Sequence, residues 1–232
     1  MLQTKSISFK YDEKFILDDI SIGIKEGSFT AIIGANGSGK TTLAKHFNAL
    51  LIPAKGDVFV DGINTIKNPF EVRKKVGFVF QNPEDQLVNS IVEEDIAFGL
   101  ENLNTPREKM QKIVLETLAE LNISHLAKRN VNFLSAGQKQ LVALAGVLAM
   151  NPYYIILDEP TTLLDARNKK NIFSILANLN KKQGKTIILI TNLLDDLKIT
   201  QDVIVLKEGK IIFSGKKASL NRKILKEAGL DE

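Results

Sequence analysis

Runs of mainly apolar residues recur along the 232-residue chain, at residues 29–33, 76–80, 153–157 and 187–190. Uninterrupted apolar runs of this length are typical of parallel strands that are covered on both faces. Residues 42–51 and 166–182 instead predict helices. Together these patterns predict an α/β fold built on a parallel sheet.

Other segments predict antiparallel strands. Residues 2–9 alternate apolar and polar side chains, and residues 16–24 continue as a further strand. Residues 57–62 predict a short strand that ends in the hairpin-like pair Asp61–Gly62. Residues 203–213 predict a hairpin across Glu208–Gly209, and a short charged helix follows. We therefore expect an antiparallel β subdomain beside the parallel sheet.

The stretch of residues 82–151 is predicted to be mostly helical. Thr105 and Glu108 form a capping-box pattern, with Pro106 expected at the first helical position. Ser135 and Gln138 form a second capping-box pattern before a run of apolar residues at helical spacing.

A glycine-rich segment, GANGSGKT at residues 34–41, lies between a predicted strand and a predicted helix. It matches the phosphate-binding loop G-x-x-x-x-G-K-[ST] in its required strand–loop–helix setting. Glycines allow the backbone N–H groups to approach a phosphate, and the helix behind them presents its positive end. The predicted nucleotide-binding residues are Gly34, Asn36, Gly37, Ser38, Gly39, Lys40, Thr41 and Thr42.

Within this phosphate loop, Lys40 is expected to reach the β- and γ-phosphates, and the Thr41 hydroxyl to bind Mg²⁺. The alternative is a glycine-rich turn before an ordinary helix. The motif instead predicts a P-loop nucleotide-binding core, formed by residues 1–81 and 152–232, into which the helical subdomain of residues 82–151 is inserted.

Two acidic residues, Asp158 and Glu159, end the predicted strand of residues 153–157. Ligands of parallel α/β sheets bind at the carboxyl ends of strands, so both acids are expected to face the phosphate loop. Asp158 is the predicted Mg²⁺ ligand, and Glu159 is expected to polarise a water molecule beside the γ-phosphate. The alternative is a polar strand end before a proline turn.

Composition restricts the function only broadly. The chain is 44% hydrophobic and 25% charged, as in ordinary globular proteins, and it has no cysteine for disulfides or thiolate chemistry. No apolar run is long enough to span a membrane, and the start lacks the apolar core of a signal peptide. The net charge of +4 allows an anionic partner, but the basic residues are scattered and no nucleic acid is expected. We interpret Lys169–Lys170 as a solvated helix end, and His46 and His125 as helix-surface or core residues.

The order of four motifs resembles an ATP-binding-cassette (ABC) ATPase over nearly the whole chain. The motifs are the phosphate loop, Gln81 at a strand end, LSAGQ at residues 134–138 and ILDEP at residues 156–160. Residues 80–86 and 92–102 further resemble the ATPase subunits of energy-coupling-factor importers of the vitamin and cobalt type.

This resemblance implies roles for residues outside the phosphate loop. Tyr11 is implied to stack on adenine, as an aromatic face can. Gln81 is implied to contact Mg²⁺ or the attacking water and to link the core to the helical subdomain. Asp165 is implied to lie at a dimer interface, at the end of the segment TLLD of residues 162–165.

The signature segment, which we define as residues 134–138, is implied to complete the site of a second subunit. Ser135, Gly137 and Gln138 are its expected nucleotide-binding residues, because a helix N-terminus there receives the γ-phosphate of ATP held by the opposite chain. The capping box competes with this use of Ser135. The implied cofactors are ATP and Mg²⁺.

Three residues depart from the family pattern. Ala136 replaces a glycine, which is a mild disturbance unless its φ is positive. Leu141 stands in place of an arginine. Asn192 replaces a histidine that contacts the γ-phosphate, and an amide carries neither a proton nor a positive charge. We therefore hypothesise slow hydrolysis at this chain's own site, with an intact cassette subunit supplying most turnover in a heterodimer.

The resemblance implies an ATPase on the cytoplasmic side of the cell membrane, bound to integral membrane subunits that import a vitamin or metal ion. Residues 81–101, including Gln86 and Asp95, are the expected docking surface. The partner cassette can be a second copy or a different subunit, and the chain end at Glu232 predicts weak pairing without ATP.

Two other functions stay open. A soluble cassette ATPase of the chromosomal type needs a long coiled coil before the signature segment, and only residues 41–134 lie there; ribosomal types usually carry two cassettes. A regulatory subunit that holds ATP without useful hydrolysis is the other alternative, and Asn192 favours it.

Overall fold

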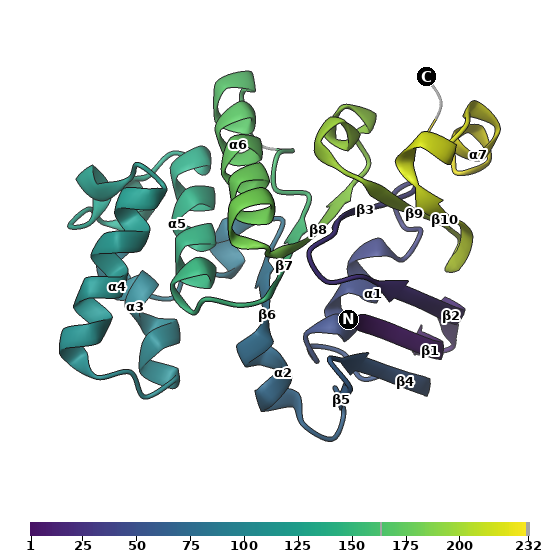
Figure 1. Ribbon diagram of the computed structural model, residues 1–232, viewed down its shortest axis with the longest axis horizontal. Coiled ribbons are helices and arrows are strands. Elements are labelled where there is room, and N and C mark those ends of the chain that lie inside the picture. Colours follow the sequence, from purple (N-terminus) through teal and green to yellow (C-terminus); the bar gives the residue numbers. More distant parts are fainter. Residues whose placement is uncertain (163, 231–232) are drawn as a thin grey trace.

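The computed structural model describes residues 1–162 and 164–230 and contains two sheets (Figure 1). The larger sheet has the strand order β10-β9-β3-β8-β7-β6. Its strands are β3 (Phe29–Ile33), β6 (Val76–Val79), β7 (Tyr154–Asp158), β8 (Thr186–Thr191), β9 (Asp202–Lys207) and β10 (Lys210–Lys216). All neighbours pair parallel except β9 and β10. The α/β fold expected from the apolar runs is therefore confirmed, as is the final hairpin.

The smaller sheet is antiparallel and has the order β2-β1-β4-β5. Its strands are β1 (Leu2–Tyr11), β2 (Lys14–Ile24), β4 (Lys55–Val60) and β5 (Ile63–Asn64). Asp61 and Gly62 connect β4 to β5 with φ values of 50° and 79°. Two successive positive φ values are typical of the tight hairpin turn that the Asp–Gly pair predicts.

Helix α1 (Lys40–Phe47) belongs to the apolar core that joins the two sheets. Its Leu43 and Phe47 are fully buried in a cluster with Leu17 of β2 and Ile32 of β3. The helix expected at residues 42–51 thus begins two residues earlier and ends sooner, because the chain turns through Ala49 at a φ of 58°.

Most of the remaining helices lie on the side of the larger sheet that carries β6 and β7, whereas the last helix lies at the other end of this sheet, beside β10 (Figure 1). They are α2 (Pro69–Lys75), α3 (Val92–Asn102), α4 (Arg107–Glu120), α5 (Ala136–Ala149), α6 (Ala166–Gln183) and α7 (Arg222–Glu227). Short 3₁₀ helices are η1 (Pro83–Asp85), η2 (Ser124–Leu126), η3 (Val131–Phe133), η4 (Leu194–Ile199) and η5 (Lys217–Ser219). Apolar residues of α3, α4, α5 and α6 share one buried cluster with β3, β7 and β8. No helix among residues 1–162 and 164–230 is long and apolar enough to cross a membrane.

The capping box predicted at Thr105 is wrong. Helix α4 begins at Arg107, with Pro106 as its N-cap at an extended ψ of 141° and no side-chain cap. The Thr105 N–H donates to the Leu100 carbonyl at 3.0 Å, so this residue belongs to the exit from α3 instead.

Three of the motifs, together with Asn192, follow neighbouring strands of the larger sheet, whereas the signature segment begins helix α5. The phosphate loop follows β3, Gln81 follows β6, Asp158 is the last residue of β7, and Asn192 follows β8. Because these strands are parallel, their carboxyl ends lie at one edge, and the fold gathers the motifs there.

Candidate nucleotide-binding site

Two glycines of the phosphate loop occupy positions where a side chain would collide with the backbone. Gly34 has a φ of 154°, and a Cβ there would lie 2.2 Å from the Leu206 carbonyl oxygen. Gly39 has a φ of 102°, and a Cβ there would lie 2.9 Å from the Ile16 carbonyl oxygen. The loop can therefore bend tightly only with glycine at both positions.

Lys40 is folded against its own loop. Its Nζ donates to the carbonyl oxygens of Gly34 at 2.8 Å and Ala35 at 3.1 Å. Burial lowers the pKa of Lys40, although the carboxylates of Glu159 and Asp158 oppose the shift. Ser38 Oγ is also buried and has no hydrogen-bond partner among the described residues. A buried cation and an unsatisfied hydroxyl in one loop fit an anionic ligand.

Thr41 and Asp158 meet although they come from different elements, since Thr41 lies in the first turn of α1 and Asp158 ends β7. The Thr41 hydroxyl donates to Asp158 Oδ1 at 3.0 Å. Burial raises the pKa of Asp158, and the Thr41 hydrogen bond opposes this shift. A hydroxyl and a carboxylate are oxygen donors of the kind that Mg²⁺ prefers, so the pair fits this ion. Among residues 1–162 and 164–230 no cluster of three or more His, Cys, Asp or Glu could hold a metal, but nucleotide-bound Mg²⁺ needs only one or two protein ligands besides phosphates.

Glu159 adopts an unusual backbone conformation next to this pair. Its φ is 44°, a region that costs a non-glycine residue roughly 1–3 kcal/mol. Its N–H donates to the Ile190 carbonyl at 2.9 Å, and its Oε2 accepts from Gln81 Nε2 at 2.9 Å. The Thr162 hydroxyl lies 3.4 Å from the same oxygen. Glu159 is therefore held between β6, β7 and β8.

Asn192 also contacts the phosphate loop. Its Nδ2 donates to Asn36 Oδ1 at 3.2 Å. The structure thus brings Lys40, Asp158, Glu159 and Gln81 together with Asn192 at one edge of the sheet.

Tyr11 stands at the end of β1 with half of its surface exposed (50%). Its ring packs edge-on against Phe9 at 4.9 Å, and Phe9 packs edge-on against His46 of α1 at the same distance. His46 is fully buried, and its Nδ1 lies 2.7 Å from the Thr42 carbonyl oxygen. This aromatic row ties Tyr11 to the helix behind the phosphate loop. The sequence gives no signal for this row beyond the place of Phe9 on the apolar side of β1, because Phe9 and His46 are far apart in the chain.

The signature segment forms the start of α5. Ser135 Oγ accepts from the Gln138 N–H at 3.3 Å, and Gln138 Oε1 accepts from the Ser135 N–H at 3.0 Å, which confirms the capping box. Ala136 is not among the residues with positive φ, so its methyl group adds no backbone strain. Leu141 is buried in the apolar cluster of the helices.

Asp165 lies next to the signature segment. It is the N-cap of α6, where it accepts from the Asn168 N–H at 2.8 Å and from Asn168 Nδ2 at 3.1 Å. A Cβ on Gly137 would lie 3.1 Å from the same Asn168 amide. Leu163, in the segment before Asp165, lies outside the described residues. Within the part of the chain that the structure describes, no hydrogen bond joins residues 135–138 to the phosphate loop.

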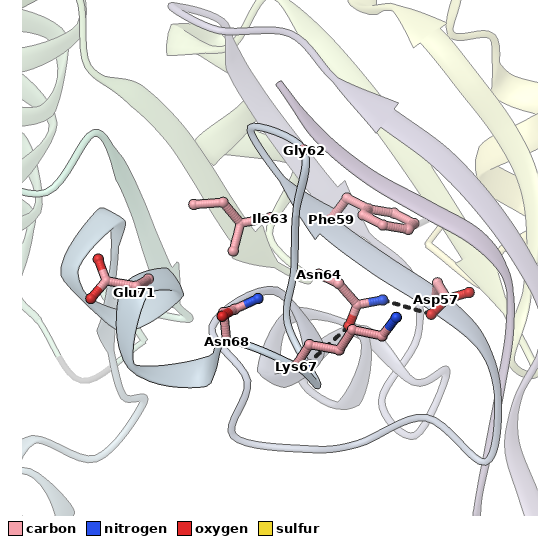
Figure 2. Close-up of a pocket in the computed structure, with 8 residues that line it drawn as sticks. All are labelled: Asp57, Phe59, Gly62, Ile63, Asn64, Lys67, Asn68 and Glu71. Carbon is pink, nitrogen blue, oxygen red and sulfur yellow. Dashed lines mark hydrogen bonds between the residues drawn. The ribbon is translucent and has the colours of Figure 1, made fainter.

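A surface hollow of about 620 Å³ lies elsewhere, between β4, β5 and the start of α2 (Figure 2). Asn64 crosses its floor and donates to Asp57 Oδ1 at 2.7 Å. None of its lining residues belongs to the motifs, so it is separate from the nucleotide site.

Comparisons with known proteins identify the family. Residues 17–162 match the family described as ABC transporter. The chain is 42% identical over 240 residues to the energy-coupling factor transporter ATP-binding protein EcfA1 of Caldanaerobacter subterraneus subsp. tengcongensis, covering 100% of this chain and 87% of that protein.

Two solved structures also resemble it. CbiO1 of Clostridium perfringens, part of the ABC transporter complex cbiONQ, is 35% identical with a TM-score of 0.85, covering 99% of this chain and 94% of that one. The cassette MJ0796, in a dimer bound to ADP and Pi, is 31% identical with a TM-score of 0.83, covering 93% of this chain and 98% of that one. The chain belongs to the ABC transporter family of ATP-binding, ATP-hydrolysing proteins.

Proposed function

We propose that this protein is the ATP-binding subunit of an energy-coupling-factor importer and that it uses ATP hydrolysis to drive uptake of a vitamin or metal ion. The relatives named above, EcfA1 and CbiO1, support this class of transporter subunit. The observation that carries the proposal is the convergence of the pairs Thr41–Asp158 and Gln81–Glu159 beside Lys40. A binding cation, two oxygen donors and a carboxylate held by an amide are the parts that phosphoryl transfer to water requires.

In the proposed mechanism the loop amides and Lys40 bind the triphosphate. Thr41, Asp158 and Gln81 would hold Mg²⁺, which neutralises charge on the phosphates when bound. Glu159 takes a proton from the attacking water, and Gln81 fixes the direction of the Glu159 carboxylate. Tyr11 offers an exposed ring face to adenine.

A second cassette completes the proposed site. Ser135, Gly137 and Gln138 present the start of α5, and Asp165 lies beside them, yet in the described residues no hydrogen bond connects this group to its own phosphate loop. The solved cassette MJ0796 is a dimer. We therefore assign the signature segment to the γ-phosphate of ATP held by the partner cassette, which is a second copy or a different subunit.

The proposed docking surface for integral membrane subunits is a groove of about 410 Å³ between α3, α5 and β6. Gln86 and Asp95 shape its wall. Gln86 accepts from the Phe80 N–H at 3.0 Å and donates to the Ala143 carbonyl at 3.2 Å. Asp95 accepts from the N–H groups of Val88 and Asn89 at 2.7 and 2.8 Å.

Because the side chains of Gln86 and Asp95 are used internally and most of the other lining residues are apolar, the groove offers mainly apolar side chains to a partner. Val88 and Phe98 are 65% and 40% exposed there. This arrangement suits a partner helix with an apolar face. We propose that the chain binds in this way at the cytoplasmic side of the cell membrane.

One structural feature favours a second function, a regulatory subunit that holds ATP with little hydrolysis. The side-chain amide of Asn192 donates its hydrogen bond to Asn36, and it offers no positive charge to a γ-phosphate. In that case a different cassette, paired with this chain, would supply most turnover.

Purification of the tagged chain from membranes tests the proposal. Integral membrane subunits and one cassette partner should co-purify, and the complex should bind ATP in the presence of Mg²⁺. Lys40→Ala should weaken ATP binding at least about tenfold, because a charge-assisted contact contributes roughly 1.5–3 kcal/mol. Absence of membrane subunits, or unchanged ATP affinity in Lys40→Ala, would contradict the proposal.

A further inference from the structure

Asp196 is a buried carboxylate that the mechanism above does not use. It lies in η4, the segment that follows Asn192, and its side chain is 0% exposed. A buried carboxylate is costly unless it is paired and hydrogen-bonded. The partners of Asp196 therefore decide which parts of the chain it holds together.

Side chains from three segments converge on this carboxylate. Oδ2 accepts from the hydroxyl of Thr161 at 3.1 Å and from the hydroxyl of Thr191 at 2.7 Å. Oδ1 forms an ion pair with Lys169 Nζ at 2.5 Å. Thr161 lies in the loop after β7, Thr191 ends β8, and Lys169 lies in the first turns of α6. We call these four residues the Asp196 cluster.

Both threonines stand beside residues of the proposed catalytic site. Thr191 directly precedes Asn192, and Thr161 follows Glu159 by one intervening residue, Pro160. Glu159 has a φ of 44°, and such a conformation persists only where the surroundings fix it. Its N–H donates to the carbonyl of Ile190, the residue before Thr191. This bond and the Asp196 cluster together close the β7 and β8 loops against each other.

The ion pair extends the cluster to α6. The Lys169 N–H donates to the carbonyl of Asp165, the N-cap residue beside the signature segment, at 2.9 Å. The Lys169 ammonium also lies 5.5 Å from the Phe173 ring centre. Lys169 thus links Asp196 to Asp165 at the start of α6, and this part of the chain is expected to face a second cassette.

We propose that Asp196 is a positioning residue for ATP hydrolysis. It fixes the loop that carries Glu159 relative to the loop that carries Asn192, and Lys169 joins both to the start of α6. The inference rests on the proposed function, because hydrolysis is what reports the position of Glu159. No member of the cluster belongs to the phosphate loop or, among the described residues, is hydrogen-bonded to it, so we expect ATP binding to change little when the cluster is lost.

The test compares Asp196→Asn and Thr161→Val with wild type in the purified transporter complex. With hydrolysis by any partner cassette subtracted, Asp196→Asn should lower the kcat of this chain's site at least about tenfold, and Thr161→Val by a smaller factor, while KM for ATP changes less than about twofold. Lys217→Met is the matched control. Lys217 Nζ donates to the Leu197 and Lys198 carbonyls at 2.8 and 3.3 Å, so it holds the same η4 without reaching either loop. Its kcat should equal that of wild type.

A double variant separates positioning from folding. Asp196→Asn leaves the Lys169 ammonium without its carboxylate, and Lys169→Met in the same chain removes that unpaired charge. The double variant should regain thermal stability relative to Asp196→Asn and yet keep the low kcat.

Two results would overturn the inference: wild-type kcat in a folded Asp196→Asn complex, or kcat that returns together with stability in the double variant. Wild-type turnover in the same preparation distinguishes the two kinds of failure. A wild-type complex without turnover refutes the proposed function, whereas turnover that Asp196→Asn leaves unchanged refutes only the role of Asp196.

Discussion

The side-chain amide of Asn192 donates a hydrogen bond of 3.2 Å to the side-chain carbonyl of Asn36 in the phosphate loop. This bond links the end of β8 to the loop after β3, and it uses an amide where the resemblance to ABC ATPases implies a histidine. An amide cannot hold a positive charge or transfer a proton. The site built on Lys40 and Glu159 is therefore expected to hydrolyse ATP slowly.

In the complex with the native partner, Asn192→His should raise hydrolysis at this chain's own site by about tenfold or more, because a donor aimed at transition-state charge is worth a factor of this order or larger. The measurement is the kcat of this site, with hydrolysis by the partner cassette subtracted. Asn192→Ala serves as the control, since it removes the bond to Asn36 without adding a donor, and it should give no gain. No rise in Asn192→His would count against the assignment of slow hydrolysis to this position.

The docking groove can be tested through its exposed apolar residues. Phe98→Ala should lower transport by about tenfold or more while basal ATP hydrolysis is kept, because a central apolar anchor typically contributes roughly 2 kcal/mol to an interface. Val88→Ala should act in the same direction. Parallel assays of substrate uptake and ATP hydrolysis in vesicles provide the measurement.

Leu115→Ala is the matched control for the groove, because Leu115 is 61% exposed on α4 but does not line the groove. Its uptake should equal that of wild type. Gln86→Ala and Asp95→Asn should also uncouple hydrolysis from uptake, through the wall that these side chains hold in shape. Unchanged uptake in all four groove variants would show that the membrane subunits dock elsewhere.

His46 predicts a dependence of folding stability on pH. Burial lowers its pKa below the ordinary value of 6.5, and its contact with the Thr42 carbonyl opposes only part of this effect. The unfolded chain therefore binds a proton at a higher pH than the folded chain does. Consequently the contribution of His46 to the free energy of unfolding should be fully present above pH 6.5 and should be lost as the pH drops below this value.

Denaturant unfolding at several values between about pH 5 and 8 would measure this loss. His46→Leu should flatten the decline. His125→Gln changes the other histidine, which is exposed, and should keep the wild-type slope. An equal slope in wild type and His46→Leu would refute the role of His46.

The sequence predicted the features that depend on short segments. The phosphate loop, the Asp158–Glu159 strand end and the capping box at Ser135 are local patterns, and the apolar runs fix the strands that carry them. The Asp196 cluster has no such signal, because residues 161, 169, 191 and 196 meet only after α6 and β8 have packed.

Lys169 shows why the sequence alone was insufficient here. A Lys–Lys pair is typical of a solvated helix end, yet Lys169 forms an ion pair with a fully buried carboxylate. Similarly, Thr105 fits the pattern of a helix cap, but its backbone N–H donates to the Leu100 carbonyl at the end of α3. For Lys169 a tertiary contact outweighs the local preference, and for Thr105 the end of the preceding helix does.

The most direct test of the account is ATP turnover by the membrane complex that carries Glu159→Gln. Glutamine keeps the shape of the side chain but cannot accept a proton, and loss of a general base costs about 10²–10⁴-fold in rate. We predict a fall in kcat of this size for the site of this chain, with ATP affinity changed by less than about threefold. An unchanged kcat in Glu159→Gln, measured with any hydrolysis by a partner cassette subtracted, would contradict the central claim that this carboxylate drives hydrolysis.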